Sequence, residues 1–375
     1  PVIRAFGRER SAEKRFDKAN SNLKKTQLFT NRVMTFMQPL LMLLMNFLGV
    51  AIIWVASHRI DTGDMQVGSM TAFLTYSMMI VMSFMILTVM SILIPRAAVA
   101  ASRIDEVIKC ESSVLDREGA IEIKDSAGRL EFDNVSFRYS NAEENVISGI
   151  SFIAKPGETT AIIGSTGSGK STIVNLIPRF FDVTAGSIKL DGRDIRNLRI
   201  KSLRDQIGFV PQKGILFSGT INSNIRFGNE DATPEEIRKA AEIAQALEFV
   251  EEKEDGFEST IAQGGSNVSG GQKQRISIAR AIAKNPKILV FDDSFSALDM
   301  KTDVKLRKVL AQYEKDATKI IVAQRVGTIM DAEQIIVLDD GEIVGKGRHR
   351  DLLRTCDIYR QIAESQLSKS ELEVE

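Results

Sequence analysis

Two long stretches in the first hundred residues contain no charged side chain. They cover residues 33–57 and 65–95 and are rich in Leu, Ile, Val, Met and Phe. A helix of about 20 apolar residues spans the hydrocarbon core of a bilayer. The pattern therefore predicts transmembrane helices at about 33–57 and 66–95. A pair of buried core helices is the alternative that the same pattern allows.

Basic residues around these stretches indicate how they would lie in a membrane. Residues 1–32 contain nine Lys and Arg residues, whereas the short connection between the stretches contains only Arg59. Arg96 and Arg103 follow the second stretch. Cytoplasmic loops are enriched in Lys and Arg. We therefore expect a cytoplasmic loop at about 1–30, both ends of the segment in the cytoplasm and the connection outside.

The pattern changes after about residue 118, where short apolar runs alternate with amphipathic segments. Strands and helices that alternate in this way predict an α/β domain, with helices on the faces of a parallel sheet. A helical subdomain is expected at about 213–285, and about 364–375 reads as a charged tail. The expected strands lie within residues 129–140, 146–157, 159–164, 287–293, 319–324 and 333–347.

Composition excludes several classes of function. The 49 basic and 49 acidic residues cancel, so no excess charge favours nucleic acid as a partner. Cys110 and Cys356 lie in separate regions, which fits a reducing compartment rather than a disulfide framework. With only His58 and His349 in the chain, a histidine-rich metal site is excluded.

A glycine-rich segment, GSTGSGKST, lies between the expected strand 159–164 and an expected helix. It fits the pattern G-x-x-x-x-G-K-[ST], in which backbone N–H groups enclose phosphates and the lysine adds positive charge. The flanking strand and helix distinguish it from a glycine-rich turn that arises by chance. We predict that phosphates bind at Gly164, Ser165, Thr166, Gly167, Ser168, Gly169, Lys170, Ser171 and Thr172, with the Ser171 hydroxyl on Mg²⁺.

Two further motifs carry candidate chemistry. The apolar run ILVFDD ends in Asp292 and Asp293, and nucleotide-hydrolysing enzymes with this glycine-rich loop hold Mg²⁺ partly through an acidic residue at such a strand end. A solvated turn would not explain two carboxylates in tandem. About 100 residues after the glycine-rich loop, VSGGQ precedes an amphipathic helix and resembles a second anion cradle, built from a hydroxyl, bare amides and a helix N-terminus. Its residues are Ser269, Gly270, Gly271 and Gln272.

Together these motifs resemble the ATP-binding cassette (ABC) family, specifically exporters whose membrane helices precede the nucleotide-binding domain. GSTGSGKST, VSGGQ and FDDSFSALD are the specific matches, and the resemblance covers essentially the whole chain. PVIRAFGRER resembles the cytoplasmic loop after the fourth membrane helix, so helices one to four are expected upstream. Residues 1–117 would then be the C-terminal part of the transmembrane domain and residues 118–375 the nucleotide-binding domain.

The resemblance implies ATP and Mg²⁺ as cofactors and assigns further residues. Tyr139 matches the aromatic residue that stacks on adenine, and Gln212 the glutamine that senses Mg²⁺ and the γ-phosphate. Asp299 matches the loop that communicates across a dimer. Mg²⁺ would then be held by Ser171, Gln212 and Asp292. In this family two nucleotide-binding domains enclose two ATP molecules, each between the glycine-rich loop of one and the SGGQ of the other.

Three positions depart from the family pattern. Asp293 stands where glutamate normally faces the attacking water, and Gln324 where histidine normally acts as the switch residue. Glutamine still donates a hydrogen bond, but it neither carries charge nor relays a proton. Gln263 replaces a glutamate in the loop that contacts the membrane domain. With Lys170 and Gln212, Asp293 and Gln324 form the expected hydrolytic residues of an impaired site.

The sequence thus suggests half of a heterodimeric exporter in the cytoplasmic membrane, with its nucleotide-binding domain in the cytoplasm. Its own site would bind ATP but hydrolyse it slowly, while its SGGQ completes the site of a second half-transporter. A homodimer with two slow sites and an ATP-gated subunit without transport are the alternatives. The membrane stretches argue against a soluble ABC protein that acts on nucleic acid. Drug, lipid and peptide all stay open as substrates.

Overall fold

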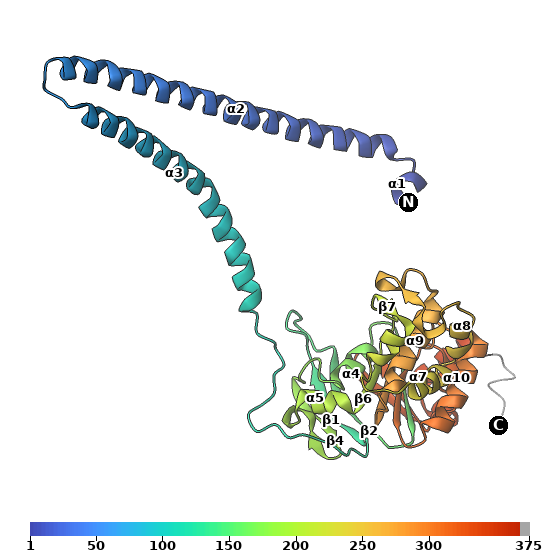
Figure 1. The fold of residues 1–375 in the computed structure, drawn as a ribbon. Helices are drawn as coiled ribbons and strands as arrows, with labels where there is room; N and C mark the ends of the chain where they lie inside the picture. The colour runs from blue at the N-terminus through green and yellow to red at the C-terminus, as the bar shows by residue number, and fades with distance from the viewer. Residues whose placement is uncertain (368–375) are drawn as a thin grey trace. The chain divides into compact units, whose positions relative to one another are not determined.

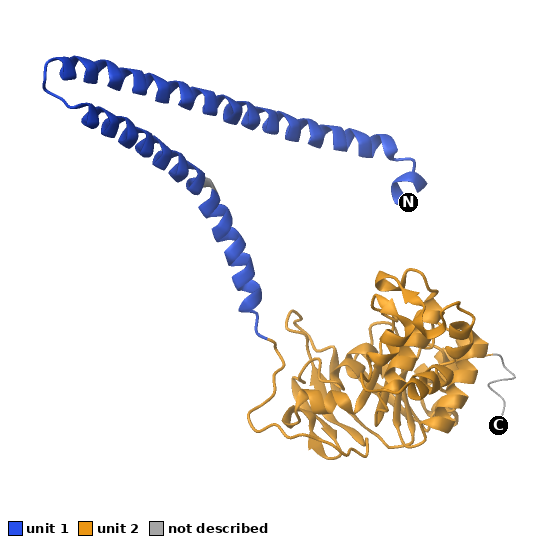
Figure 2. Cartoon of the chain, viewed as in Figure 1, with its two compact units in different colours: residues 1–111 blue, residues 112–375 orange. Residues whose placement is uncertain are grey.

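The computed structural model describes residues 1–367 and divides the chain into two compact units, residues 1–111 and 112–375 (Figure 2). The sequence-based expectation placed this boundary after residue 117. Of the predicted charged tail, residues 364–366 belong to the last helix, and the part from residue 368 lies outside the described residues.

The first unit consists of helices α1 (Val2–Ala5), α2 (Glu9–Asp61) and α3 (Val67–Ile108), and α2 and α3 form a hairpin (Figure 1). Both long helices are long and apolar enough to cross a membrane. Among the described side chains of this unit, only Ala56 is buried. Buried core helices would pack their apolar side chains within the chain, so this exposure disfavours the alternative reading.

The residues predicted as a cytoplasmic loop are largely helical rather than irregular. Helix α2 already begins at Glu9, and α3 continues past the predicted end at residue 95 to Ile108. These extensions are rich in Lys, Glu, Arg and Ala, which favour helix even where apolar packing is absent. The apolar stretch therefore indicates which part of each helix can lie in lipid, but it does not indicate where the helix ends.

The second unit is built around a six-stranded sheet in the order β12-β11-β3-β10-β9-β6. All neighbouring strands pair in parallel, except that β12 pairs antiparallel with β11. The strands are β3 (Thr159–Gly164), β6 (Ile207–Val210), β9 (Ile288–Asp292), β10 (Thr318–Val322), β11 (Gln334–Asp339) and β12 (Glu342–Gly347).

Both faces of the central strands are buried, because successive side chains point to opposite sides of a sheet. In β9, Leu289 and Phe291 join one hydrophobic cluster, whereas Ile288 and Val290 join the other. This explains the continuous apolar run ILVF, in which every residue is buried. Two cores on one sheet leave only the strand ends free for polar side chains.

A second, antiparallel sheet has the order β2-β1-β4-β5, with β1 (Leu130–Phe137), β2 (Ile147–Ala154), β4 (Ala185–Leu190) and β5 (Arg193–Asp194). It covers one face of the main sheet, since its apolar residues share a cluster with Ile288 and Val290. The predicted strands before residue 157 therefore do not belong to the parallel sheet. No helix connects β1 to β2, and a short connection makes consecutive strands antiparallel.

Helices contribute to both cores of this unit (Figure 1). A two-stranded ribbon of β7 (Gly219–Thr220) and β8 (Thr260–Ile261) lies within the predicted helical region. The helices are α4 (Lys170–Leu176), α5 (Ile200–Asp205), α6 (Ile221–Arg226), α7 (Pro234–Ile243), α8 (Leu247–Glu251), α9 (Gly270–Ala283), α10 (Met300–Tyr313), α11 (Val326–Ile329), α12 (His349–Thr355) and α13 (Asp357–Gln366), with 3₁₀ turns at Ile195–Asn197, Gly256–Glu258 and Gln263–Gly265.

A buried amide joins α6 to α9. The Asn224 side chain accepts from the Phe217 N–H (2.9 Å) and from the Arg280 guanidinium (2.8 Å). It also donates to the carbonyl oxygens of Phe217 and Thr220, each at 2.9 Å. Burial lowers the pKa of Arg280 to about 10. The network satisfies all of these groups only while the asparagine is present.

Replacement of Asn224 by alanine should therefore destabilise this unit. Several buried donors and acceptors would lose their partner, so we expect the free energy of unfolding to fall by about 2–4 kcal/mol. Asn222→Ala is the matched control, because that amide donates to the exposed Glu258 and should cost no more than about 0.5 kcal/mol. Denaturation of the detergent-solubilised chain measures both, and equal losses would contradict the role of the network.

Candidate functional site

Four parallel strands end at one edge of the main sheet, and each is followed by a candidate residue. The glycine-rich loop follows β3, Gln212 follows β6, Asp292 closes β9 and Gln324 follows β10. Parallel strands present their carboxyl ends at the same edge, where α/β domains bind ligands. The structure brings these residues together around a pocket of about 270 Å³, lined by Val146, Thr166, Gly167, Gly169, Lys170, Ser171, Thr172, Gln212, Asp292, Asp293, Val322 and Gln324.

The glycine-rich loop connects β3 directly to α4. Gly167 (φ 90°) and Gly169 (φ 92°) take left-handed backbone conformations that favour glycine. A Cβ on Gly169 would lie 2.5 Å from the Ile147 side chain, and one on Gly164 would lie 2.1 Å from the Leu338 carbonyl oxygen. The loop can therefore curl as it does only without side chains at these positions, which leaves its N–H groups accessible to phosphate oxygens.

Lys170 is the first residue of α4, and its side chain folds back along the loop. Its Nζ donates to the carbonyl oxygens of Gly164 (2.9 Å) and Ser165 (2.5 Å). Burial lowers the pKa of this lysine, an effect that the nearby Asp293 and Asp292 oppose. The ammonium is thus tethered at the centre of the loop, beside the place where phosphate charge would lie.

Two oxygen-bearing side chains meet at the start of α4. The Ser171 hydroxyl donates to Asp292 Oδ1 at 2.9 Å, and Asp292 is buried. Burial raises the pKa of Asp292, and the neighbouring Asp293 carboxylate raises it further, although the Ser171 hydrogen bond opposes the change. A hydroxyl and a buried carboxylate in contact are the hard oxygen donors that Mg²⁺ prefers.

The two positions that depart from the family pattern touch each other. The Gln324 amide donates to Asp293 Oδ2 at 2.7 Å, and the Gln212 amide donates to the same oxygen at 3.2 Å. Asp293 is buried, its φ is 48°, and burial raises the pKa of its carboxyl. Two neutral amides thus bind one oxygen of the Asp293 carboxylate. The family pattern has glutamate in place of Asp293 and histidine in place of Gln324.

Tyr139 lies just beyond the end of β1 and not among the pocket-lining residues. Its hydroxyl is 3.3 Å from the Thr172 Oγ1, and its ring packs edge-on against Phe137 and Phe181. The tyrosine therefore adjoins the first turn of α4. The predicted stacking on adenine stays a prediction.

The SGGQ residues lie at the start of α9, outside the pocket. Ser269 caps this helix by accepting from the Gln272 N–H at 3.3 Å, and the Gln272 side chain accepts from the Ser269 N–H at 3.0 Å. Gly270 has open space at its Cβ position, and Gly271 faces the carbonyl oxygen of Ala297. The structure thus does not bring this motif to the chain's own glycine-rich loop.

Two other predicted residues lie away from the pocket as well. Asp299 caps α10 by accepting from the Thr302 N–H at 3.0 Å, and this bond lowers the pKa of the aspartate. Gln263 is exposed at the start of a 3₁₀ turn. Both are available on the surface of this unit.

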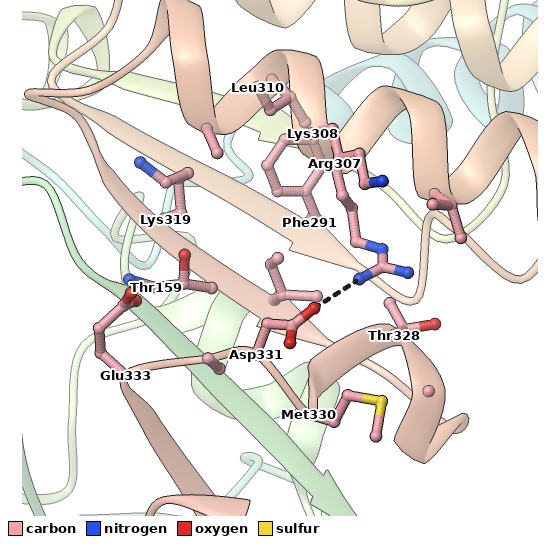
Figure 3. A pocket seen from close by; sticks show the side chains of 15 residues that line it. Thr159, Phe291, Arg307, Lys308, Leu310, Lys319, Thr328, Met330, Asp331 and Glu333 are labelled. Carbon is pink, nitrogen blue, oxygen red and sulfur yellow. Dashed lines mark hydrogen bonds and ion pairs between the residues drawn. The ribbon is translucent and has the colours of Figure 1, made fainter. Parts of the chain in front are cut away.

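A larger cavity, of about 370 Å³, lies between α10, β10 and α11 (Figure 3). Two of its cationic side chains already have partners: Arg307 donates to Asp303 at 2.9 Å, and the Lys319 ammonium donates to the carbonyl oxygens of Glu314 and Ala317. It contains no residue of the glycine-rich loop. Cavity size alone therefore does not mark the nucleotide site in this fold.

Comparison with known proteins agrees with this geometry. A family model of the ABC transporter matches residues 147–296, and a model of the ABC transporter transmembrane region matches residues 1–84. The chain belongs to the ABC transporter family. It carries the helical membrane region of that family followed by its ATP-binding α/β domain.

Relatives include exporters. An uncharacterized ABC transporter ATP-binding protein of Mycobacterium tuberculosis is 43% identical over 97% of this chain and 63% of its own length. An ATP-dependent lipid A-core flippase of Hahella chejuensis is 36% identical over 99% and 63%. A solved bacterial Atm1-family ABC exporter with ATP bound has a TM-score of 0.85 at 30% identity, over 98% of this chain and 65% of that one. The chain thus spans less than two thirds of these relatives.

The contacts of this ABC site include residues that the sequence motifs did not reveal. Val146 and Val322 line the pocket, and the Gln366 side chain binds the backbone on both sides of Arg325, the residue after Gln324. Val322 lies near the end of the expected strand 319–324 and is the last residue of β10, so its place near the edge was predictable. Gln366 is 42 residues away along the chain, and no local pattern connects it to the site.

The contact between Ser171 and Asp292 predicts that loss of the Ser171 hydroxyl weakens only the Mg²⁺-dependent part of ATP binding. Ser171→Ala removes one oxygen ligand but leaves the backbone cradle and Lys170, so the Mg²⁺-dependent gain in ATP affinity should fall about tenfold while Mg²⁺-free binding changes little. Ser165→Ala, in the exposed part of the loop, is the control. Calorimetric titration with and without Mg²⁺ measures both, and equal losses in both conditions would contradict the assignment.

The raised pKa of Asp293 predicts that Asp293→Asn stabilises the nucleotide-free protein at pH 7.5, with a rise in Tm of about 2 °C. The folded state binds this proton more tightly than the unfolded state, so ionisation costs stability at neutral pH. The gain should therefore shrink as the pH falls through the raised pKa. The exposed Asp255→Asn is the control in scanning fluorimetry, and a gain that persists at low pH would contradict a charge effect.

Proposed function

We propose that this chain is part of a half-transporter that uses ATP to export a drug, lipid or peptide across the cytoplasmic membrane. Residues 1–117 would form the C-terminal part of its transmembrane domain and residues 118–375 its cytoplasmic nucleotide-binding domain. The membrane region and the ATP-binding domain on one chain support an exporter. Relatives named as a lipid A-core flippase and a putative multidrug export protein support an amphipathic substrate.

Mg²⁺ would bind between the glycine-rich loop and the end of β9. Ser171 and Asp292 would hold it directly, since their oxygens already converge at 2.9 Å. Gln212 lines the same pocket from β6 and would complete the set. The metal would neutralise phosphate charge, while Lys170 and the loop amides would orient the phosphates.

A second chain would complete each ATP site. The SGGQ start of α9 and Asp299 lie outside the pocket of their own chain, although both motifs are intact. A helix N-terminus with bare glycine amides suits an anion. The SGGQ motif of this chain would close over the ATP that the partner binds. The SGGQ motif of the partner would close over the ATP that this chain binds.

The hydrogen bond between Gln324 and Asp293 carries the proposal that the chain's own site hydrolyses ATP slowly. Hydrolysis needs a group that orients the attacking water and accepts its proton. Asp293 is one methylene shorter than the glutamate of the family pattern, and a misplacement of about 1 Å can cost on the order of 10²-fold in rate. Gln324 cannot take part in proton transfer.

The same geometry also binds the γ-phosphate region firmly. Lys170, the loop amides and Gln324 all remain able to donate hydrogen bonds there. The site would thus hold ATP for long periods, while the partner's site, completed by Ser269 and Gly271 of this chain, turns over. A heterodimer follows if the partner keeps the glutamate and histidine. A homodimer with two slow sites is the second candidate.

The proposal predicts that restoring the family residues accelerates the site. Asp293→Glu with Gln324→His should raise ATP turnover at this site at least tenfold, because the water-facing carboxylate and the switch imidazole both return. The assay uses the full-length transporter in lipid, alone and with its partner. Lys170→Ala serves as the control that removes ATP binding.

Three results would contradict the proposal. Full ATPase activity from the unaltered chain alone, unchanged by a partner, would mean that the site is not impaired. Vesicle transport that persists with Lys170→Ala in this chain and with the corresponding lysine of the partner replaced would mean that ATP does not drive export. Absence of any transport by the ATPase-active assembly would favour the ATP-gated subunit.

A further inference from the structure

The backbone around the switch residue is held by a side chain from the C-terminal helix. Gln366, the last residue of α13, accepts from the Val326 N–H through Oε1 at 2.8 Å. Its Nε2 donates to the Gln324 carbonyl oxygen at 2.9 Å. One amide thus bridges both peptide groups that flank Arg325.

This bridge replaces a helix cap that the local sequence lacks. Val326 is the first residue of α11, and the N–H groups at a helix start need partners from outside the helix. The capping position holds Arg325, whose side chain makes no capping hydrogen bond. Without Gln366, the Val326 N–H and the Gln324 carbonyl oxygen would turn to water, and the segment would be free to shift.

Helix α13 is packed into the core, so it can hold the Gln366 side chain in a fixed position. Tyr359 and Ala363 are fully buried in the main core. The Tyr359 hydroxyl also lies 2.7 Å from His349 Nδ1 at the start of α12. Gln366 therefore reaches the switch segment from a packed support rather than from a loop.

Fixing the Gln324 backbone also affects Asp293, because the Gln324 side chain contacts that aspartate. The Gln324 carbonyl oxygen is fixed by Gln366, and the side chain of the same residue donates to Asp293 Oδ2 at 2.7 Å. A shift of the Gln324 backbone would move that amide away from the carboxylate and from the phosphate side of the pocket.

We propose that Gln366 is a positioning residue for the switch residue, and that the end of α13 sets the geometry of the ATP site. It is not among the residues that line the pocket, and it acts only through the backbone of residues 324–326. This inference rests on the proposed function for its kinetic consequence, whereas its structural consequence is independent of any activity.

The structural arm measures hydrogen exchange of residues 323–329 in the full-length protein without nucleotide. Gln366→Met keeps the length of the side chain but removes both hydrogen bonds, so exchange in this segment should rise at least fivefold. Gln361→Met is the matched control, an exposed glutamine on the same helix, and should leave it unchanged. Gln366→Glu retains an acceptor for the Val326 N–H but loses the donor to Gln324, so Val326 should stay protected.

The kinetic arm measures ATP turnover in the unaltered transporter and in the variant with Asp293→Glu and Gln324→His. In the restored variant, where this chain's own site turns over, Gln366→Met should lower kcat threefold to tenfold, with a change of less than twofold in KM for ATP. Gln366→Glu should lower kcat as well, since the Gln324 carbonyl loses its donor. Gln361→Met should change neither constant.

Each failure has its own signature. Unchanged exchange in Gln366→Met, or unchanged kcat beside raised exchange, would overturn the positioning role. A raised KM for ATP together with a lowered free energy of unfolding would indicate general destabilisation, and it would also overturn the positioning role. If the restored variant is no faster than the unaltered one, the proposed slow site is wrong, and the Gln366 comparison is then read in the unaltered protein.

Discussion

The parallel register of β3, β6, β9 and β10 is the constraint on which the site depends. Because these strands share one direction, the glycine-rich loop, Gln212, the two aspartates and Gln324 all meet at one edge of the sheet. Burial of both sheet faces makes the middle of each central strand apolar and leaves polar side chains to the strand ends, of which this edge is one. The same burial raises the pKa of both aspartates, so the site favours a cation between them and the phosphates.

Asp293 lies where two of these strand ends meet, and its contacts bear on how fast the site hydrolyses ATP. Its carboxylate oxygen receives the amides of Gln212 and Gln324, from two different strand ends. The two unusual residues are therefore one contact rather than two independent changes, and each suits the other. A neutral donor beside a short carboxylate keeps the hydrogen bonding of the site, and the proposed slow hydrolysis rests on the shorter reach of that carboxylate and on the neutral amide of Gln324.

Motifs predicted which residues gather at this edge because these residues lie next to strand ends that hydrophobic patterning reveals. GSTGSGKST and ILVFDD each follow an apolar run, so the ABC fold and its ATP site were readable from sequence. Other features depend on contacts that no pattern encodes. The separate antiparallel sheet, the helical residues from Glu9, the Asp293–Gln324 bond and the Gln366 bridge each join segments by packing, which spacing along the chain does not reveal.

The most direct measurement identifies which nucleotide remains on this chain during turnover. The assembled transporter is supplied with photoreactive ATP labelled on the α-phosphate, irradiated after several turnovers and separated into its chains. A slow site predicts that the nucleotide cross-linked to this chain is mainly the triphosphate, while the partner carries mainly the diphosphate. Equal proportions of diphosphate on both chains would contradict the division of labour between the two sites.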